Sequence, residues 1–161
     1  FGKTKLGSLL LYAKQSQNKN LMTELTGAVK SKIKAVILKH KISAVGFIPP
    51  TVKRETQLMN ELQKNLVLPL PVINLKKIKT EIIVPQKTLV KLEERIENAK
   101  QTIFLTNNHI YQNVLLIDDA VGSGATLNET ARKLKERKVA RKVFGLAITG
   151  SFKGFEVISE I

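Results

Sequence analysis

Residues 113–126 read NVLLIDDAVGSGAT and carry the strongest structural signal in the chain. The apolar run from Asn113 to Asp118 predicts a buried β-strand. Two glycines in the segment Asp119–Ala125 predict a loop, and the pattern after it predicts a helix over residues 126–137. A strand, a short glycine loop and a helix in this order are typical of α/β proteins, in which helices connect parallel strands.

The sequence around this stretch alternates in the same way between helical and strand patterns. Leu25, Val29 and Ile33 recur at helical spacing, whereas Ser43–Ile48 is a short apolar run that Pro49-Pro50 ends. Helices are predicted over about 20–40, 53–65 and 88–99, strands over 43–48, 72–75 and 142–149, a loop over 76–85 and a turn at 107–109. This alternation predicts an α/β fold with a parallel sheet and helices on both faces.

The length and composition suit one domain with a substantial core, since 43% of the 161 residues are hydrophobic. We expect a basic helical N-terminal part over 1–42 and a core over 43–150. The absence of cysteine excludes disulfides and thiolate metal sites. No apolar run approaches the roughly 18 residues that a membrane span needs, and no signal peptide is evident. These features predict a single soluble, cytoplasmic domain.

Basic residues outnumber acidic ones, 27 against 13, and the formal net charge is +14. The excess lies in residues 1–80, which hold 15 Lys or Arg and 3 Glu. It indicates a polyanionic partner such as single-stranded DNA, with compositional drift towards Lys as the alternative. Six Phe, two Tyr and no Trp leave few stacking platforms for bases. The candidate DNA-binding residues lie on the helix predicted over 20–40 and are Lys30, Lys32, Lys34 and Lys39.

The strand predicted at residues 113–118 brings two adjacent carboxylates, Asp118 and Asp119, to its carboxyl end, where open α/β sheets bind ligands. The two glycines of the loop let the backbone approach a ligand closely or take positive φ. Amides at the start of the next helix, with the hydroxyls of Ser123 and Thr126, form a cradle for a phosphate monoester. The carboxylates would repel that phosphate unless they hold sugar hydroxyls or a divalent cation. A vicinal diol beside a phosphate is the signature of a ribose 5-phosphate.

Less specific explanations exist for the same residues. Gly-Ser-Gly is common at tight connections between a strand and a helix. An acidic pair after an apolar strand also occurs in phospho-acceptor receiver domains, although here too few residues remain for the later strands of such a domain. The chain has neither G-x-x-x-x-G-K-[ST] nor G-x-G-x-x-G. His40 and His109 lack metal-ligand spacing, which favours a surface or capping role.

Residues 114–126 resemble the phosphoribosyl pyrophosphate (PRPP) binding motif of type I phosphoribosyltransferases, apolar-apolar-Asp-Asp-x-x-Thr-Thr-Gly-x-Thr. Gly122-Ser123 stands where Thr-Thr is usual, so one hydroxyl is kept and one is lost. The stretch from Lys79 to Phe104 is similar to the R-T-x5-Q-x2-L-x5-R-x2-N-x5-F pattern of the competence protein F (ComF/GntX-like) family, and Ile48-Pro49-Pro50 matches a proline-bearing turn of that family. The matching residues of the longer stretch are Thr80, Gln86, Leu89, Arg95, Asn98 and Phe104, and Lys79 stands where the pattern prefers Arg.

The resemblance implies a type I phosphoribosyltransferase-like fold and a site for PRPP with Mg²⁺. Asp118 and Asp119, the candidate catalytic residues, would hold the ribose hydroxyls and, through them or through water, the metal. The 5-phosphate would be bound by Ala120, Val121, Gly122, Ser123, Gly124, Ala125 and Thr126. The pyrophosphate side would comprise Pro49, Pro50, Thr51, Lys53, Arg54, Lys79 and Thr80, with residues 76–86 as a loop that closes over it. Family members usually carry an N-terminal four-cysteine zinc module, which has no counterpart in this cysteine-free chain.

Three functions remain as hypotheses. The family resemblance implies a PRPP-binding protein that acts in natural transformation, in the uptake of single-stranded DNA, alongside other competence proteins. The alternative is a purine or pyrimidine salvage phosphoribosyltransferase, which transfers ribose 5-phosphate from PRPP to a base. A third is a nucleic-acid module that captures a nucleotide end without turnover. Catalysis stays open at this stage, because the sequence does not locate a pocket for a base.

Overall fold

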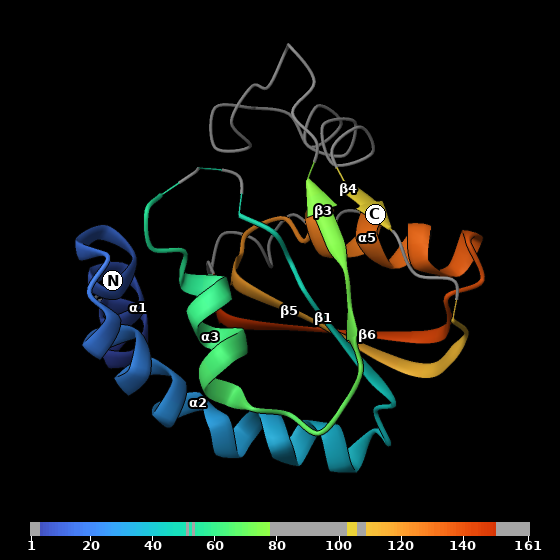
Figure 1. Ribbon diagram of the computed structural model, residues 1–161, viewed down its shortest axis with the longest axis horizontal. Helices are drawn as coiled ribbons and strands as arrows, with labels where there is room; N and C mark the ends of the chain where they lie inside the picture. The colour runs from blue at the N-terminus through green and yellow to red at the C-terminus, as the bar shows by residue number, and fades with distance from the viewer. Residues whose placement is uncertain (1–3, 51, 53, 78–102, 106–108, 151–161) are drawn as a thin grey trace.

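The computed structural model describes residues 4–50, 52, 54–77, 103–105 and 109–150 (Figure 1). Four strands form one sheet in the order β2-β1-β5-β6, and every neighbouring pair is parallel. These strands are β1 (Ala44–Phe47), β2 (Val72–Ile73), β5 (Tyr111–Val121) and β6 (Ala140–Gly150). A separate antiparallel pair joins β3 (Leu75–Lys77) to β4 (Ile103–Leu105).

Side chains of the central strand β5 alternate between two hydrophobic cores, one on each face of the sheet, because successive strand residues point to opposite faces. Leu115 and Ile117 belong to the core shared with three helices on one face. Val114 and Leu116 belong to the core shared with a fourth helix on the other face (Figure 1). The first three helices are α1 (Lys5–Ser16), α2 (Lys19–Lys39) and α3 (Leu58–Leu66), and the fourth is α5 (Ala125–Glu136).

Capping side chains determine where the first two helices begin. Thr4 Oγ1 accepts a hydrogen bond from the backbone amide of Gly7 at 3.1 Å, at the start of α1. Asn18 Oδ1 accepts one from the amide of Asn20 at 2.8 Å, at the start of α2. Helix α1, which lies between these two caps in the sequence, buries Leu10 in the core on its face of the sheet. The N-terminal helix is therefore an integral part of the fold and not an appendage.

The chain leaves the two central strands towards opposite faces of the sheet. After β1 it passes through α3 to β2, and after β5 it passes through α5 to β6. The two connections part between the carboxyl ends of β1 and β5, which is the position where open α/β sheets bind ligands. The amide of Ile48 donates to the carbonyl of Ile117 at 2.9 Å as the two strands separate. Asp118 and Asp119 come immediately after Ile117, where β1 no longer covers that edge of β5.

The α/β class, the parallel sheet and the helices on both faces are confirmed. Two predicted boundaries are wrong by three residues or more. The helix expected from residue 53 begins at Leu58, because the preceding segment docks α1, with the amide of Thr56 donating to Gln17 Oε1 at 3.0 Å. The loop expected from Asp119 begins only at Gly122, because β6 continues to pair with β5 as far as its last residue.

Lys76 and Lys77, expected in a loop, instead belong to β3, where pairing with β4 gives them an extended backbone. The strand expected over 72–75 is divided between β2 and the first residue of β3. Within the helical part expected over 1–42, the sequence pattern located only the helix over 20–40 and did not locate α1. The helix expected over 88–99, most of the loop over 76–85 and part of the turn at 107–109 lie outside the described residues. Within the described part of the chain, none of the helices has the length and apolar character to cross a bilayer.

Candidate functional site

A cavity of about 600 Å³ opens at the carboxyl ends of β1 and β5. Its walls come from the end of β5 with its connection to α5, from the segment between β1 and the start of α3, and from one side of α1. The end of β6 contributes Thr149 and Gly150. The point at which the two connections part is thus a cavity with walls from distant parts of the sequence.

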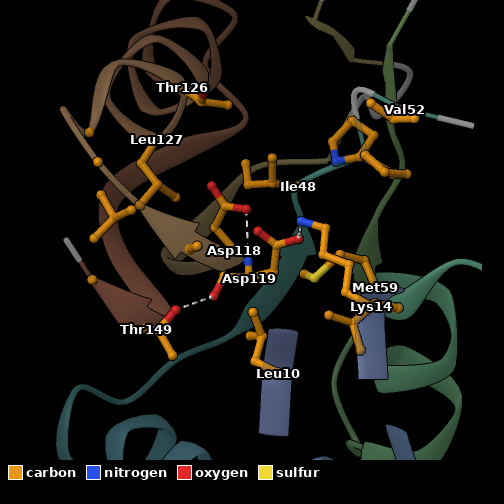
Figure 2. Close-up of a pocket in the computed structure, with 18 of the residues that line it drawn as sticks. Leu10, Lys14, Ile48, Val52, Met59, Asp118, Asp119, Thr126, Leu127 and Thr149 are labelled. Atoms are coloured by element: carbon orange, nitrogen blue, oxygen red, sulfur yellow. Dashed lines mark hydrogen bonds and ion pairs between the residues drawn. The ribbon is translucent and has the colours of Figure 1, made fainter. Parts of the chain in front are cut away.

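The two aspartates lie on opposite sides of β5, because neighbouring strand residues alternate between faces. Asp118 lies on the α5 side, and its Oδ1 accepts a hydrogen bond from the amide of Asp119 at 2.8 Å. Asp119 lies on the α1 side, where its carboxylate forms an ion pair with the ammonium of Lys14 (Figure 2). The hydroxyl of Thr149 donates to the carbonyl of Asp119 at 3.4 Å. Both carboxylates line the cavity.

The connection from β5 to α5 is a tight turn that lines the cavity together with the first residues of α5. Gly124 has φ +75°, a left-handed conformation that glycine adopts without strain, whereas Gly122 does not need this freedom. The amide of Ala125 donates to Ser123 Oγ at 3.4 Å. Gly124 is the N-cap residue of α5 and has no side chain to accept the amides of the first turn. These amides and the positive end of the helix dipole favour a bound anion.

A strongly perturbed group on α5 lies outside the cavity and is structural. The buried carboxylate of Glu129 accepts a hydrogen bond from Arg132 Nε at 2.9 Å. This bond raises the pKa of Arg132 above its usual range. The pair lies within α5, three positions apart, and takes no part in the cavity lining.

The residues predicted for the pyrophosphate side are divided. Pro49, Pro50 and Arg54 line the cavity, and Arg54 donates from its guanidinium to the backbone carbonyl of Lys14. Thr51, Lys53, Lys79 and Thr80 lie outside the described residues, as do Gln86, Arg95 and Asn98.

The carboxyl end of α2, which carries Lys39, lies at the other end of the sheet from the aspartates. The carbonyl of His40, which caps the carboxyl end of α2, accepts a hydrogen bond at 2.8 Å from Asn113 near the start of β5. Six residues of strand, about 20 Å, separate Asn113 from Asp119. At 100° per residue the four predicted DNA-binding lysines flank the buried stripe of α2 on two sides. Lys32, Lys34 and Lys39 are exposed and Lys30 is half-buried. They form no part of the cavity wall.

Sequence reasoning missed the contribution of α1. Leu10, Leu11 and Lys14 line the cavity, although they precede the aspartates by more than a hundred residues. The only signal for α1 in the sequence is an apolar run followed by a lysine. Nothing in that pattern says which element the helix packs against.

Comparisons with known proteins identify the fold. No protein-family model matches the chain, and no curated protein matches it. The chain resembles a solved adenine phosphoribosyltransferase, with TM-score 0.53, 14% identity, and coverage of 87% of this chain and 76% of that one. It also resembles a hypoxanthine-guanine phosphoribosyltransferase from Bacillus anthracis, with TM-score 0.51, 11% identity, and coverage of 84% and 72%. The chain therefore has an α/β fold of the type I phosphoribosyltransferase kind, as the sequence motif implied.

Proposed function

We propose that the chain binds PRPP in the cavity at the carboxyl ends of β1 and β5. The observation that supports this most strongly is that one strand and its turn bring two carboxylates and the N-terminus of α5 to the same cavity. Helix amides suit a phosphate monoester, and carboxylates suit sugar hydroxyls. A ribose 5-phosphate carries both groups, so the site has matching partners for each.

The phosphate end of the ligand would lie at the turn between β5 and α5. Ser123 and Thr126 supply hydroxyls there, and both line the cavity. The positive φ of Gly124 turns the chain directly into the helix. In this arrangement the phosphate contacts amide hydrogens and the positive end of the helix dipole. The carboxylates of Asp118 and Asp119 lie in β5, before the turn, and face the sugar instead.

The pyrophosphate would face the segment after β1. Arg54 supplies a positive charge from that segment and lines the cavity together with Pro49 and Pro50. The roles expected for Thr51, Lys53, Lys79 and Thr80 stay predictions from the sequence.

The residues present are compatible with a magnesium ion carried by the ligand. Within the described residues there is no group of three or more His, Cys, Asp or Glu side chains that could hold a metal ion on its own. Magnesium typically binds to one or two carboxylates and completes its shell with substrate oxygens and water. Asp118 and Asp119 would hold it through water or the ribose hydroxyls, and it would supply positive charge for the pyrophosphate.

Two candidate functions share PRPP binding and differ in the step after it. Salvage transfer to a purine or pyrimidine is supported by the fold that the chain shares with an adenine and a hypoxanthine-guanine phosphoribosyltransferase. A role in natural transformation is supported by the resemblance to the competence protein F family and by the net charge of +14. The two make different demands: the first needs a base and releases pyrophosphate, whereas the second needs single-stranded DNA.

A ligand series tests the proposal. Isothermal titration of the protein with PRPP, ribose 5-phosphate and ribose, each with Mg²⁺, should give measurable binding of the two phosphorylated sugars and none of ribose. Equal binding of ribose, or no binding of either phosphorylated sugar, would contradict the proposal. Pyrophosphate release from PRPP with a panel of purine and pyrimidine bases then assigns the salvage function. Failure of all bases, together with salt-dependent binding of single-stranded DNA, favours a nucleic-acid role over salvage.

A further inference from the structure

Helix α1 places a cation inside the candidate site. Lys14 Nζ forms an ion pair with Asp119 Oδ2, across 105 residues of sequence, and both side chains line the cavity (Figure 2). The side chain of Lys14 is 30% exposed and that of Asp119 is 16% exposed. The pair is thus partly desolvated, which distinguishes it from an ordinary surface salt bridge.

Contacts other than this ion pair hold α1 in place. Leu10 and Ala13 are buried in the core. The guanidinium of Arg54 donates to the carbonyl of Lys14, and the amide of Thr56 donates to Gln17 Oε1 at 3.0 Å. The backbone of Lys14 is therefore fixed beside the cavity by packing and backbone bonds, and its ammonium can serve a ligand without being needed to dock the helix.

The charges of the site explain why such a cation is useful. Asp118 and Asp119 bring two negative charges to a cavity whose proposed ligand is itself a polyanion. An ammonium carries three hydrogen-bond donors, and Asp119 needs only one of them. Lys14 can therefore remain bound to Asp119 and at the same time donate to an anionic oxygen in the cavity.

We propose that Lys14 is a ligand-binding residue, which neutralises Asp119 and donates to the pyrophosphate group of the bound ligand. This inference rests on the proposed function for the identity of the ligand. Its consequence is that the site carries part of its own countercharge, so that pyrophosphate binds measurably without a divalent cation. The opposite possibility, that Lys14 blocks Asp119 and must be displaced, makes the reverse prediction for its removal.

The test measures binding of inorganic pyrophosphate to the full chain, by titration calorimetry, first with EDTA and then with Mg²⁺. Lys14→Gln should weaken pyrophosphate binding in EDTA by roughly 10- to 100-fold, the effect of losing one charge-assisted hydrogen bond. Lys14→Arg keeps the charge and should stay within a few-fold of the unmodified protein. Lys5→Gln, at an exposed position of the same helix, is the matched control and should have no effect.

A merely structural role for Lys14 gives a different pattern. Added Mg²⁺ should recover pyrophosphate affinity more in Lys14→Gln than in the unmodified protein, because the metal replaces the missing charge, whereas damage to the fold is not repaired in this way. Unchanged or tighter binding by Lys14→Gln overturns the inference, as does the absence of pyrophosphate binding to the unmodified protein in EDTA. The proposed function is tested separately from the role of Lys14. If PRPP binding depends on the aspartates, the proposed function stands whether or not Lys14 contributes. If pyrophosphate binding depends on Lys14 but PRPP does not bind, only the proposed function is refuted.

Discussion

Two walls of the same cavity are built in different ways. The wall from β5 to α5 is one continuous segment, in which Asp118 and Gly124 are six residues apart in sequence and line the same cavity. The opposite wall comes from α1, whose Lys14 forms an ion pair with Asp119 across 105 residues of sequence. The first wall is specified by local backbone chemistry, and the second by tertiary packing. Substitutions that affect one wall, both walls or neither wall can test this difference.

The largest effect is expected where both walls share a support. Leu115 is fully buried at the centre of β5, so Leu115→Ala should lower the free energy of unfolding by about 2–5 kcal/mol in urea denaturation. Leu38→Ala removes the same atoms from a side chain that is 79% exposed and should cost less than about 0.5 kcal/mol. Similar costs for the two variants would mean that β5 is not the core strand.

The next effect separates two glycines of one wall. Gly124→Ala should destabilise the protein by about 1–2 kcal/mol, because φ of +75° strains an L-residue, and should weaken PRPP binding. Gly122→Ala is the matched control, since a Cβ there would meet no atom of the described residues within 4 Å. It should change stability by less than about 0.5 kcal/mol. Urea denaturation measures both, and equal costs would contradict the assignment of the turn to Gly124.

A smaller loss of stability should be confined to the wall that α1 forms. Arg54→Gln removes the bond to the carbonyl of Lys14 and should cost about 0.5–1.5 kcal/mol. Hydrogen exchange should become faster in α1 and remain unchanged in α5, which measures whether the two walls are independent. Lys64→Gln, at an exposed position of α3, serves as the control. Equal acceleration in both helices would show that the walls form one cooperative unit.

The smallest effect on the cavity is expected from α2. Lys32→Gln combined with Lys39→Gln should leave PRPP affinity within roughly two-fold, because neither lysine lines the cavity and both are exposed, so that salt screens their charges. If these lysines contact phosphates of single-stranded DNA, the same double variant should reduce the log–log salt slope of DNA binding by about 1.4. An unchanged slope would remove α2 from the DNA-binding surface.

The features predictable from the sequence are those with short-range causes. The continuous apolar run before Asp118 predicts a strand that is buried on both of its faces. The glycines after it predict a turn, and the pattern after the turn predicts α5. The start of α3 was not predicted, because the amide of Thr56 donates a hydrogen bond to Gln17, the residue that caps the carboxyl end of α1. The two residues Lys76 and Lys77 likewise become extended only through pairing with β4. In each case the deciding partner is remote in sequence.

The central claim is that Asp118 and Asp119 bind the ribose of PRPP. Thermal unfolding with PRPP and Mg²⁺ tests it most directly, on the unmodified chain, on Asp118→Asn/Asp119→Asn and on Glu24→Gln, an exposed acidic control. At about 100 times Kd the ligand should stabilise the unmodified chain and the control by roughly 2.7 kcal/mol, or on the order of 5–10 °C. The double variant should show no shift. A full shift in the double variant, or none in the unmodified chain, would contradict the claim.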